Sequence, residues 1–265
     1  MGFIRFDKVN KVFGTGKVGL NALEDIDLEI GEKEFVAIVG PSGCGKTTCL
    51  RIVAGFERPT SGAVSVNGKP VGSPGPDRAV VFQHFALFPW KSVRDNIDLG
   101  LRNKRLAKAK RDALIADALK LMNLESHADA FPHQLSGGMQ QRVAIARAYV
   151  LDPEVLLMDE PFGALDAQTR VTMQEELVRL TRVNPRTVLF ITHSVEEAVY
   201  LADRVAVMTR RPGRIKEMID VKAIRNAEKW STIQRIEDVM DLESFIHLRT
   251  HIWKSLREEK PEDRH

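Results

Sequence analysis

Residues 35–48 have the sequence FVAIVGPSGCGKTT, in which an apolar run leads into a glycine-rich turn and then a helix-forming segment. Phe35–Val39 predicts a buried strand, and the residues from Thr47 to Val53 predict a helix. Between them, Gly40–Thr47 matches the complete pattern G-x-x-x-x-G-K-[ST]. Glycines let backbone N–H groups turn inward around phosphate, Lys46 can reach the terminal phosphates of a nucleotide, and the Thr47 hydroxyl can ligate Mg²⁺. A turn that binds nothing is the alternative, but the flanking strand and helix favour a phosphate loop.

The predicted nucleotide-binding residues of this loop are Gly40, Pro41, Ser42, Gly43, Cys44, Gly45, Lys46, Thr47 and Thr48. Cys44 lies near the start of the predicted helix, where the pKa of a thiol can fall. We therefore consider that alkylation of Cys44 blocks nucleotide binding, against the alternative that it is a small loop residue of ordinary reactivity. Cys44 and Cys49 have no neighbouring cluster of Cys or His in the sequence, which favours a reducing cytosolic compartment over a zinc site or a disulfide framework.

Composition sets limits on the class of protein. The chain has 265 residues, is 43% hydrophobic and carries a formal net charge of +3. It can bury a large core, as one nucleotide-binding domain with subdomains or as two joined lobes. No apolar run approaches the roughly 20 residues needed to cross a bilayer, and residues 1–10 lack the apolar segment of a secretion signal. The small net charge argues against a dedicated nucleic-acid binder.

Hydrophobic patterns predict an α/β architecture. Apolar strands are expected at Val155–Met158, Val188–Ile191 and Val205–Met208, separated by helical patterns as in a parallel sheet. Residues 3–30 alternate as antiparallel strands do, and strand signals disappear between Gln83 and Val155, where apolar residues recur at helical spacing. We therefore divide the chain into a β subdomain with the first part of the core (1–85), a helical insert (86–152), the second part of the core (153–220) and a helical tail (221–265).

A second glycine-rich run, Leu135–Arg142 (LSGGMQQR), ends the helical insert. Ser136, Gly137 and Gly138 stand at the expected start of a helix and offer a hydroxyl and unobstructed N–H groups at its positive end. The run therefore predicts a second anion site, on a lobe separate from the sheet.

Two consecutive carboxylates, Asp159 and Glu160, follow the strand at Val155–Met158. Open parallel sheets place their ligands at this end of the strands. Because neighbouring side chains of a strand point apart, Asp159 is expected to face Mg²⁺ beside Thr47 while Glu160 addresses a water in line with the terminal phosphate. An acidic helix cap or a solvated turn is the alternative.

The order of these motifs resembles that of the ATP-binding subunit of an ATP-binding cassette (ABC) transporter, over nearly all of residues 1–220. The matching motifs are the phosphate loop, Leu135–Arg142, Asp159-Glu160, Ala164-Leu165-Asp166 and His193. The resemblance implies a P-loop NTPase core with a mainly parallel sheet, an N-terminal antiparallel β subdomain and an inserted α-helical subdomain. It also implies a head-to-tail dimer with a second copy or a homologous cassette. In such a dimer the signature residues Ser136, Gly137, Gly138 and Gln140 serve the ATP held by the partner.

The resemblance assigns further roles to single residues. Phe13 resembles the aromatic that stacks on adenine, with an ordinary strand hydrophobe as the alternative. Asp166 resembles the residue that connects the two sites of the dimer, and on its own would be a helix cap. Hydrolysis without a covalent intermediate is expected from Glu160, His193, Lys46 and Gln83, and the expected Mg²⁺ ligands are Thr47, Gln83 and, directly or through water, Asp159.

Softer matches point to a subgroup. Four segments resemble importers for nitrate, sulfonates and taurine: Pro76–Gln83, Leu87–Trp90, Phe162–Asp166 and Arg211–Ile215. The implied partners are transmembrane permease subunits and, indirectly, an external substrate-binding protein, but no nucleic acid. The implied location is peripheral, on the cytoplasmic face of the inner or plasma membrane. The aromatic segment His84–Trp90 suits a groove for the permease, with packing inside the helical lobe as the alternative.

Other functions stay open from the sequence. An exporter or lipid-transport ATPase would share every residue of the ATP site. A non-transport cassette acting on ribosomes or DNA commonly joins two cassettes or inserts long coiled coils, and this sequence shows neither pattern. In the tail, Phe245, Leu248, Ile252 and Leu256 form one apolar stripe, which is expected to dock on its own domain, with a partner as the alternative.

Overall fold

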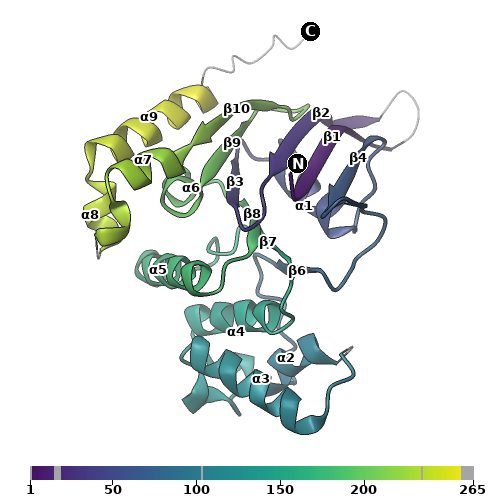
Figure 1. Ribbon diagram of the computed structural model, residues 1–265, viewed down its shortest axis with the longest axis vertical. Helices are drawn as coiled ribbons and strands as arrows, with labels where there is room; N and C mark the ends of the chain where they lie inside the picture. Colours follow the sequence, from purple (N-terminus) through teal and green to yellow (C-terminus); the bar gives the residue numbers. More distant parts are fainter. Residues whose placement is uncertain (1, 15–18, 103, 234, 258–265) are drawn as a thin grey trace. The chain divides into compact units, whose positions relative to one another are not determined.

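The computed structural model describes residues 2–14, 19–102, 104–233 and 235–257 (Figure 1). The chain divides into two compact units. We call residues 1–75 with 177–265 the core unit, and residues 76–176 the insert unit. Each unit is described separately.

The core unit begins with an antiparallel sheet of strand order β2-β1-β4-β5, as its alternating sequence predicts. Its strands are β1 (Ile4–Phe13), β2 (Leu20–Ile30), β4 (Ser61–Val66) and β5 (Lys69–Pro70). Ile4 of β1 pairs with Ile30 of β2 on one side and with Val66 of β4 on the other. All three side chains are buried, so one face of this sheet contributes to the core.

The predicted parallel strands form the centre of the core unit. They are β3 (Phe35–Val39), β8 (Thr187–Ile191) and β9 (Arg204–Met208), and β3 pairs in parallel with the other two. All residues of β3 and β8 are buried, which accounts for their continuous apolar sequences. β10 (Ile215–Asp220) adds to β9 in antiparallel direction, and α1 (Lys46–Ala54) packs against β8 and β4. The phosphate loop therefore joins a fully buried strand to a packed helix.

The insert unit contains a parallel pair of strands and, between these strands in the sequence, a group of helices. β6 (Arg78–Val81) pairs with β7 (Val155–Asp159), and between them lie α2 (Val93–Asp98), α3 (Lys108–Leu121) and α4 (Gly137–Tyr149). Short 3₁₀ turns span Leu99–Leu101, Glu125–His127 and Pro132–Gln134. α4 contacts α2, α3 and β6, so it is the central helix of this unit. α5 (Ala167–Val183) begins in the insert unit and ends in the core unit.

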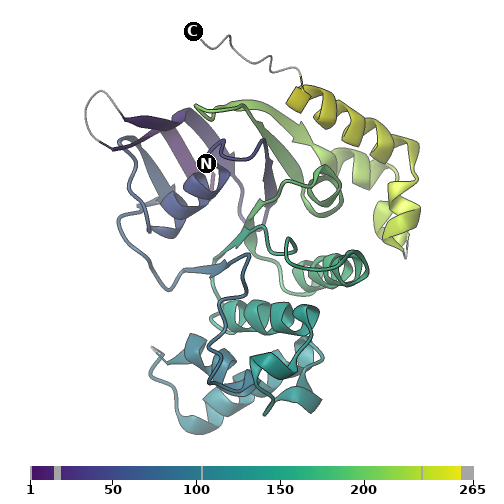
Figure 2. The same ribbon diagram turned by 180° about the vertical axis from the view of Figure 1, so that it is seen from behind.

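The tail packs on the core unit beside α6 (Val195–Leu201), as both views show (Figures 1 and 2). It consists of α7 (Val221–Ala227), a 3₁₀ turn (Trp230–Thr232), α8 (Ile236–Met240) and α9 (Glu243–Arg257). Phe245, Leu248 and Ile252 of the predicted stripe are buried, and α9 contacts α6 and α8. The stripe therefore docks on its own domain. Within the described ranges, each helix is too short or too polar to cross a bilayer.

Candidate functional site

The phosphate loop occupies the turn between Val39, where β3 ends, and Lys46, where α1 begins. Gly43 and Gly45 have φ angles of 76° and 106°, in the left-handed region that residues with side chains disfavour. At Gly45 there is also no room for a side chain, because a Cβ would lie 2.5 Å from Leu23 Cδ2. The glycines of the motif are therefore required by the observed backbone as well as by a ligand.

The N-terminus of α1 is open to an anion. Its N-cap, Gly45, provides no side-chain hydrogen bond, and the first turn of the helix contains no acidic residue. Ser42, Gly43 and Thr47 are exposed. The first N–H groups of a helix lack partners within the helix and carry the positive end of its dipole. The loop thus fits a nucleotide phosphate, and the Thr47 hydroxyl is a hard oxygen ligand of the type that Mg²⁺ prefers.

Lys46 donates hydrogen bonds to the loop itself. Its Nζ lies 2.8 Å from the Gly40 carbonyl oxygen and 3.1 Å from that of Pro41. The residue is 6% exposed, so its charge is satisfied by backbone carbonyls. Because an ammonium group has three N–H donors, Lys46 can contact a phosphate oxygen with the donor that these two carbonyls leave, or by exchanging one of them.

A loop between β9 and β10, residues 209–214, supports the phosphate loop from outside. The Gly213 N–H donates to the Ala22 carbonyl at 3.0 Å, and Arg211 Nε donates to the Gly43 carbonyl at 3.4 Å. A Cβ at Gly213 would overlap the Cys44 carbonyl oxygen. Sequence reasoning used Arg211–Ile215 only as a subgroup marker and missed this support. The Pro212-Gly213 pair is typical of a turn, but a pair of this kind does not specify what the turn contacts.

Cys44 is 1% exposed, and its Sγ faces Gly40 inside the loop. A reagent can reach this thiol only when the loop opens, so the described conformation gives no support to the idea of a readily alkylated cysteine. Burial raises the pKa of the neighbouring Cys49 thiol, which is inert in this state. Cys44 therefore fits the description of a small residue that fills the loop.

His193 is exposed and stands between β8 and α6. The next residue, Ser194, caps α6 by accepting the Glu197 N–H at 3.2 Å. The buried Thr192 hydroxyl donates to Glu197 Oε2 at 2.5 Å and accepts the Ser194 N–H at 3.0 Å. The histidine is thus held on a turn that is fixed on both sides, within the same unit as the phosphate loop.

In the insert unit, β7 ends at Asp159, and Glu160 lies in the turn beyond it with φ 46°. We expected the alternation of side chains along a strand to point these two carboxylates apart. That reason was wrong, because Glu160 lies outside the strand. Its direction is set instead by a left-handed backbone, a strained state found often at functional sites. Gln83 lies beside the same turn, since a Cβ at Gly163 would be 3.1 Å from Gln83 Nε2.

The signature run forms the start of α4. Ser136 is the N-cap of this helix, and its Oγ accepts the Met139 N–H at 3.3 Å. Gly138 faces α5, where a Cβ would lie 2.5 Å from Thr169 Cγ2. Next to Ser136 is a hollow of about 290 Å³, lined among others by Met139 and Arg142 of α4 and by Thr172 of α5. Gln140 turns back on its own segment, because its Nε2 donates to the Leu135 carbonyl at 3.2 Å.

Asp166 caps α5, which is the alternative that its sequence context suggested. Its carboxylate accepts the Thr169 N–H at 3.0 Å and the Thr169 hydroxyl at 2.7 Å. These hydrogen bonds hold the pKa of Asp166 below its ordinary value.

The aromatic residues predicted to bind partners are exposed. Phe13, at the end of β1, is 37% exposed, and Lys11 Nζ lies 4.7 Å from its ring centroid. In the segment after Gln83, Trp90 is 70% exposed and packs edge-on against Phe88. Arg147 of α4 donates to the carbonyls of Phe85 and Ala86 and so fixes the path of this segment. Packing inside the helical lobe therefore does not account for Trp90.

The predicted site residues divide between the two units. The core unit holds Phe13, the phosphate loop and His193, and the insert unit holds Gln83, Asp159, Glu160, Asp166 and the signature residues. Among the described residues, no three His, Cys, Asp or Glu side chains cluster as metal ligands. The predicted Mg²⁺ ligands include a single carboxylate, that of Asp159, and so do not require such a cluster.

Comparisons with known proteins agree on one family. A family model described as "ABC transporter" matches residues 23–163. The nitrate import ATP-binding protein NrtD of Synechococcus elongatus is 46% identical over 236 residues, which are 88% of this chain and 86% of that protein. The bicarbonate transport ATP-binding protein CmpC of the same organism is 43% identical over 97% of this chain, but over 38% of its own length.

Among solved structures, the chain resembles a dimeric ATP-binding cassette in a post-hydrolysis state with bound ADP and Pi. The two are 32% identical, with a TM-score of 0.71, over 82% of this chain and 98% of that chain. The segment matched by the family model contains the phosphate loop, Ser136–Gly138 and Asp159-Glu160. His193 and the tail lie beyond it.

Proposed function

Because the chain belongs to the ABC transporter family as an ATP-hydrolysing, ATP-binding subunit, we propose that it powers the import of a small anion such as nitrate, a sulfonate or taurine. The observation that carries the ATPase part is the open N-terminus of α1, with Lys46 held in the adjoining loop. The anion part rests on the subgroup segments and on the relatives named for nitrate and bicarbonate transport.

In the proposed mechanism, ATP binds with its adenine on Phe13 and its phosphates on the N–H groups of the phosphate loop. Lys46 moves from the Gly40 and Pro41 carbonyls to the terminal phosphates. Glu160 orients or deprotonates the attacking water, and His193 and Gln83 contact the phosphate being transferred and the water. No covalent bond to the protein forms at any step.

The metal ligand set is Thr47, Gln83 and, directly or through water, Asp159. These are oxygen donors, which matches the preference of Mg²⁺ for hard ligands. When bound, Mg²⁺ supplies neutralisation of charge on the outer phosphates.

Two copies, or one copy with a homologous cassette, form a head-to-tail dimer in which Ser136, Gly137, Gly138 and Gln140 serve the partner's ATP. A dimer of a related cassette supports this arrangement. Ser136 is well placed for the task, because it is exposed, stands at the positive end of the 13-residue helix α4 and borders the hollow next to α5. Asp166 links the two sites.

The permease docks against the aromatic segment that contains Trp90. The exposure of Trp90 and Phe88, and the anchoring of the preceding turn by Arg147, support this assignment. The subunit then lies at the cytoplasmic face of the membrane, and an external binding protein delivers the substrate to the permease.

The test is ATP hydrolysis by the chain reconstituted with its permease and binding protein in liposomes. Nitrate, bicarbonate, taurine and an alkanesulfonate are compared with maltose and glutamine. We expect one of the anions to stimulate hydrolysis several-fold and only with the binding protein present. Stimulation by maltose or glutamine alone would contradict the anion assignment, and stimulation that needs no binding protein would favour an exporter.

A further inference from the structure

Helix α6 connects His193 to the tail of the molecule. It spans seven residues, Val195–Leu201, and begins immediately after the capping residue Ser194. Helices this short are not stable by themselves, so the surroundings of α6 determine where it lies. It packs on β3 and β9 on one side and on α8 and α9 of the tail on another. Any displacement of α6 also displaces the turn that carries His193.

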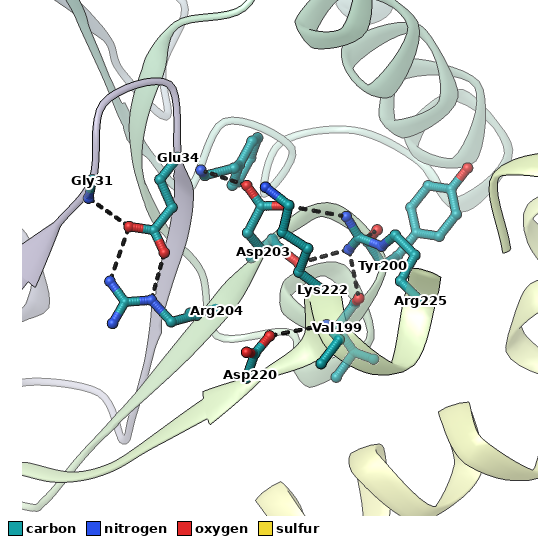
Figure 3. Close-up of polar contacts among 12 residues, drawn as sticks. Gly31, Glu34, Val199, Tyr200, Asp203, Arg204, Asp220, Lys222 and Arg225 are labelled. Atoms are coloured by element: carbon teal, nitrogen blue, oxygen red, sulfur yellow. Dashed lines mark hydrogen bonds and ion pairs between the residues drawn. The ribbon is translucent and has the colours of Figure 1, made fainter. Parts of the chain in front are cut away.

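Arg225 of α7 binds the C-terminal end of α6 (Figure 3). Its Nη2 donates to the carbonyl oxygens of Val199, Tyr200 and Ala202 at 3.3, 3.0 and 2.6 Å. The last carbonyls of a helix have no partners within it and form the negative end of its dipole, which a cation stabilises. The Arg225 guanidinium therefore both hydrogen-bonds the last carbonyls of α6 and places a positive charge at the negative end of its dipole.

The position of Arg225 is fixed independently of α6. Its Nη1 lies 3.8 Å from Asp203 Oδ1, and its side chain is 18% exposed. Asp203 also accepts the N–H of Phe35, the first residue of β3, at 3.1 Å (Figure 3). Arg225 is thus tied to the strand that leads into the phosphate loop while it holds the far end of α6.

The opposite end of α6 is fixed to His193 by short contacts. Ser194 caps the helix, and Glu197, one turn in, accepts the Thr192 hydroxyl at 2.5 Å. Thr192 and Glu197 are both buried. The helix is therefore a stiff connection of about 10 Å between the histidine turn and Arg225.

We propose that Arg225 is a positioning residue for ATP hydrolysis, which holds His193 in place through α6. This inference rests on the role proposed above for His193. Docking of the tail does not depend on Arg225, since Trp230, Phe245 and Ile252 are buried apolar anchors of the tail. The three carbonyl contacts of Arg225 are directed at α6 alone, so their loss alters the site before it detaches the tail.

The test compares Arg225→Ala and Arg225→Lys with Asp220→Ala. Asp220 caps α7 by accepting the Ala223 N–H at 3.0 Å (Figure 3). Its removal weakens the same helix without touching α6, which makes it the matched control. The purified full chains are assayed well below their unfolding temperatures for kcat and for the Kd of ATP.

We expect Arg225→Ala to lower kcat about tenfold, as misplacement of a group at an active site does, with the Kd of ATP changed less than about twofold. Arg225→Lys, which keeps the charge but not the fork of donors, should restore part of the loss, and Asp220→Ala should keep kcat near that of the wild type. Equal kcat values for Arg225→Ala and Asp220→Ala would overturn the inference.

A double-mutant cycle with His193→Ala separates the two proposals. If Arg225 acts through His193, Arg225→Ala adds little to the loss of kcat already caused by His193→Ala. A further tenfold loss in the double variant would mean that Arg225 acts elsewhere, and the inference fails while the role of His193 stands. If His193→Ala leaves kcat unchanged, the role proposed for His193 fails, and the inference fails with it.

Discussion

Gly213 is a residue at which the absence of a side chain lets two segments approach. Its backbone bridges the 209–214 loop to β2, and any Cβ there would overlap the Cys44 carbonyl and lie 2.6 Å from Met208 Cε. We predict that Gly213→Ala distorts the phosphate loop, weakens ATP binding about tenfold and lowers stability by about 1–3 kcal/mol, the usual cost of overpacking. Titration with a fluorescent ATP analogue and thermal unfolding measure both effects.

Gly72→Ala is the matched control for this change. A Cβ at Gly72 meets no atom within 4 Å, and this residue lies outside the left-handed region. The control should therefore bind ATP as the wild type does. Wild-type affinity in Gly213→Ala would show that the 209–214 loop does not shape the phosphate loop.

Glu34 gives a pH dependence that can be derived residue by residue. Burial raises the pKa of this carboxyl. Hydrogen bonds from Arg204 and the Gly31 N–H, together with the charge of Arg204, lower the pKa by more than burial raises it, so the pKa lies below the ordinary 4.5 (Figure 3). A carboxylate with a depressed pKa stabilises the fold above its unfolded value of 4.5, and this contribution is lost as the pH falls through the folded value.

We predict that Glu34→Gln lowers the free energy of unfolding by about 2 kcal/mol at pH 7, and that its difference from the wild type shrinks below pH about 4.5. Urea unfolding at pH 7, 5 and 3.5 measures the difference. Glu29→Gln removes an exposed partner of Arg5 and should change stability little at any of these pH values. A difference for Glu34→Gln that does not vary with pH would contradict the account.

At the scale of single residues, the sequence predicted the chemical roles of side chains better than it predicted their local geometry. The motif predicted Lys46 as a phosphate ligand, but not that its ammonium binds the Gly40 and Pro41 carbonyls, because a pattern of residue types does not specify where a flexible side chain rests. The sequence pattern also placed Glu160 within the strand β7, which ends one residue earlier, at Asp159. Strand ends depend on tertiary pairing, which local sequence does not encode.

At the scale of elements, the two helices that start with glycine-rich runs differ at their N-termini. The first turn of α1 has no side-chain cap and stays open, whereas Ser136 caps α4 with its own hydroxyl. The Ser136 hydroxyl therefore has a structural use in addition to its proposed contact with the partner's ATP. Substitution of Ser136 therefore removes a helix cap as well as the proposed contact with ATP. Its effect has to be compared with that of a variant that lacks a helix cap elsewhere and keeps Ser136.

The strongly apolar elements and the alternating strands β1 and β2 were predictable from the sequence, and elements with a weak pattern were not. The buried strands β3, β7, β8 and β9 and the helix α1 follow from continuous apolar runs or from the motif. β10 was not predicted, because only Ile219 of its six residues is buried and its alternation is weak. The sequence predicted a helical tail over 221–265 but not the bounds of the short helices α7 and α8, since their fixing contacts, such as those of Arg225, come from distant parts of the chain.

At the scale of the whole molecule, the proposed site residues of one chain are divided between two units. The order of the motifs could identify the family, but it does not specify which chain completes which site. The assignment of Ser136 to the ATP of a second copy therefore rests on the resemblance and on the dimer of a related cassette, and it is the central claim to test.

The most direct measurement is the mass of the Glu160→Gln variant by size-exclusion chromatography with light scattering, with and without ATP and Mg²⁺. Without hydrolysis the ATP-bound dimer should accumulate, at twice the monomer mass of 29.8 kDa. Adding Ser136→Ala should prevent dimerisation while the monomer still binds ATP. Adding Ser92→Ala instead, which removes the equivalent cap of α2, should leave the dimer intact. A Glu160→Gln/Ser136→Ala dimer as stable as that of Glu160→Gln, or loss of ATP binding by its monomer, would contradict the claim.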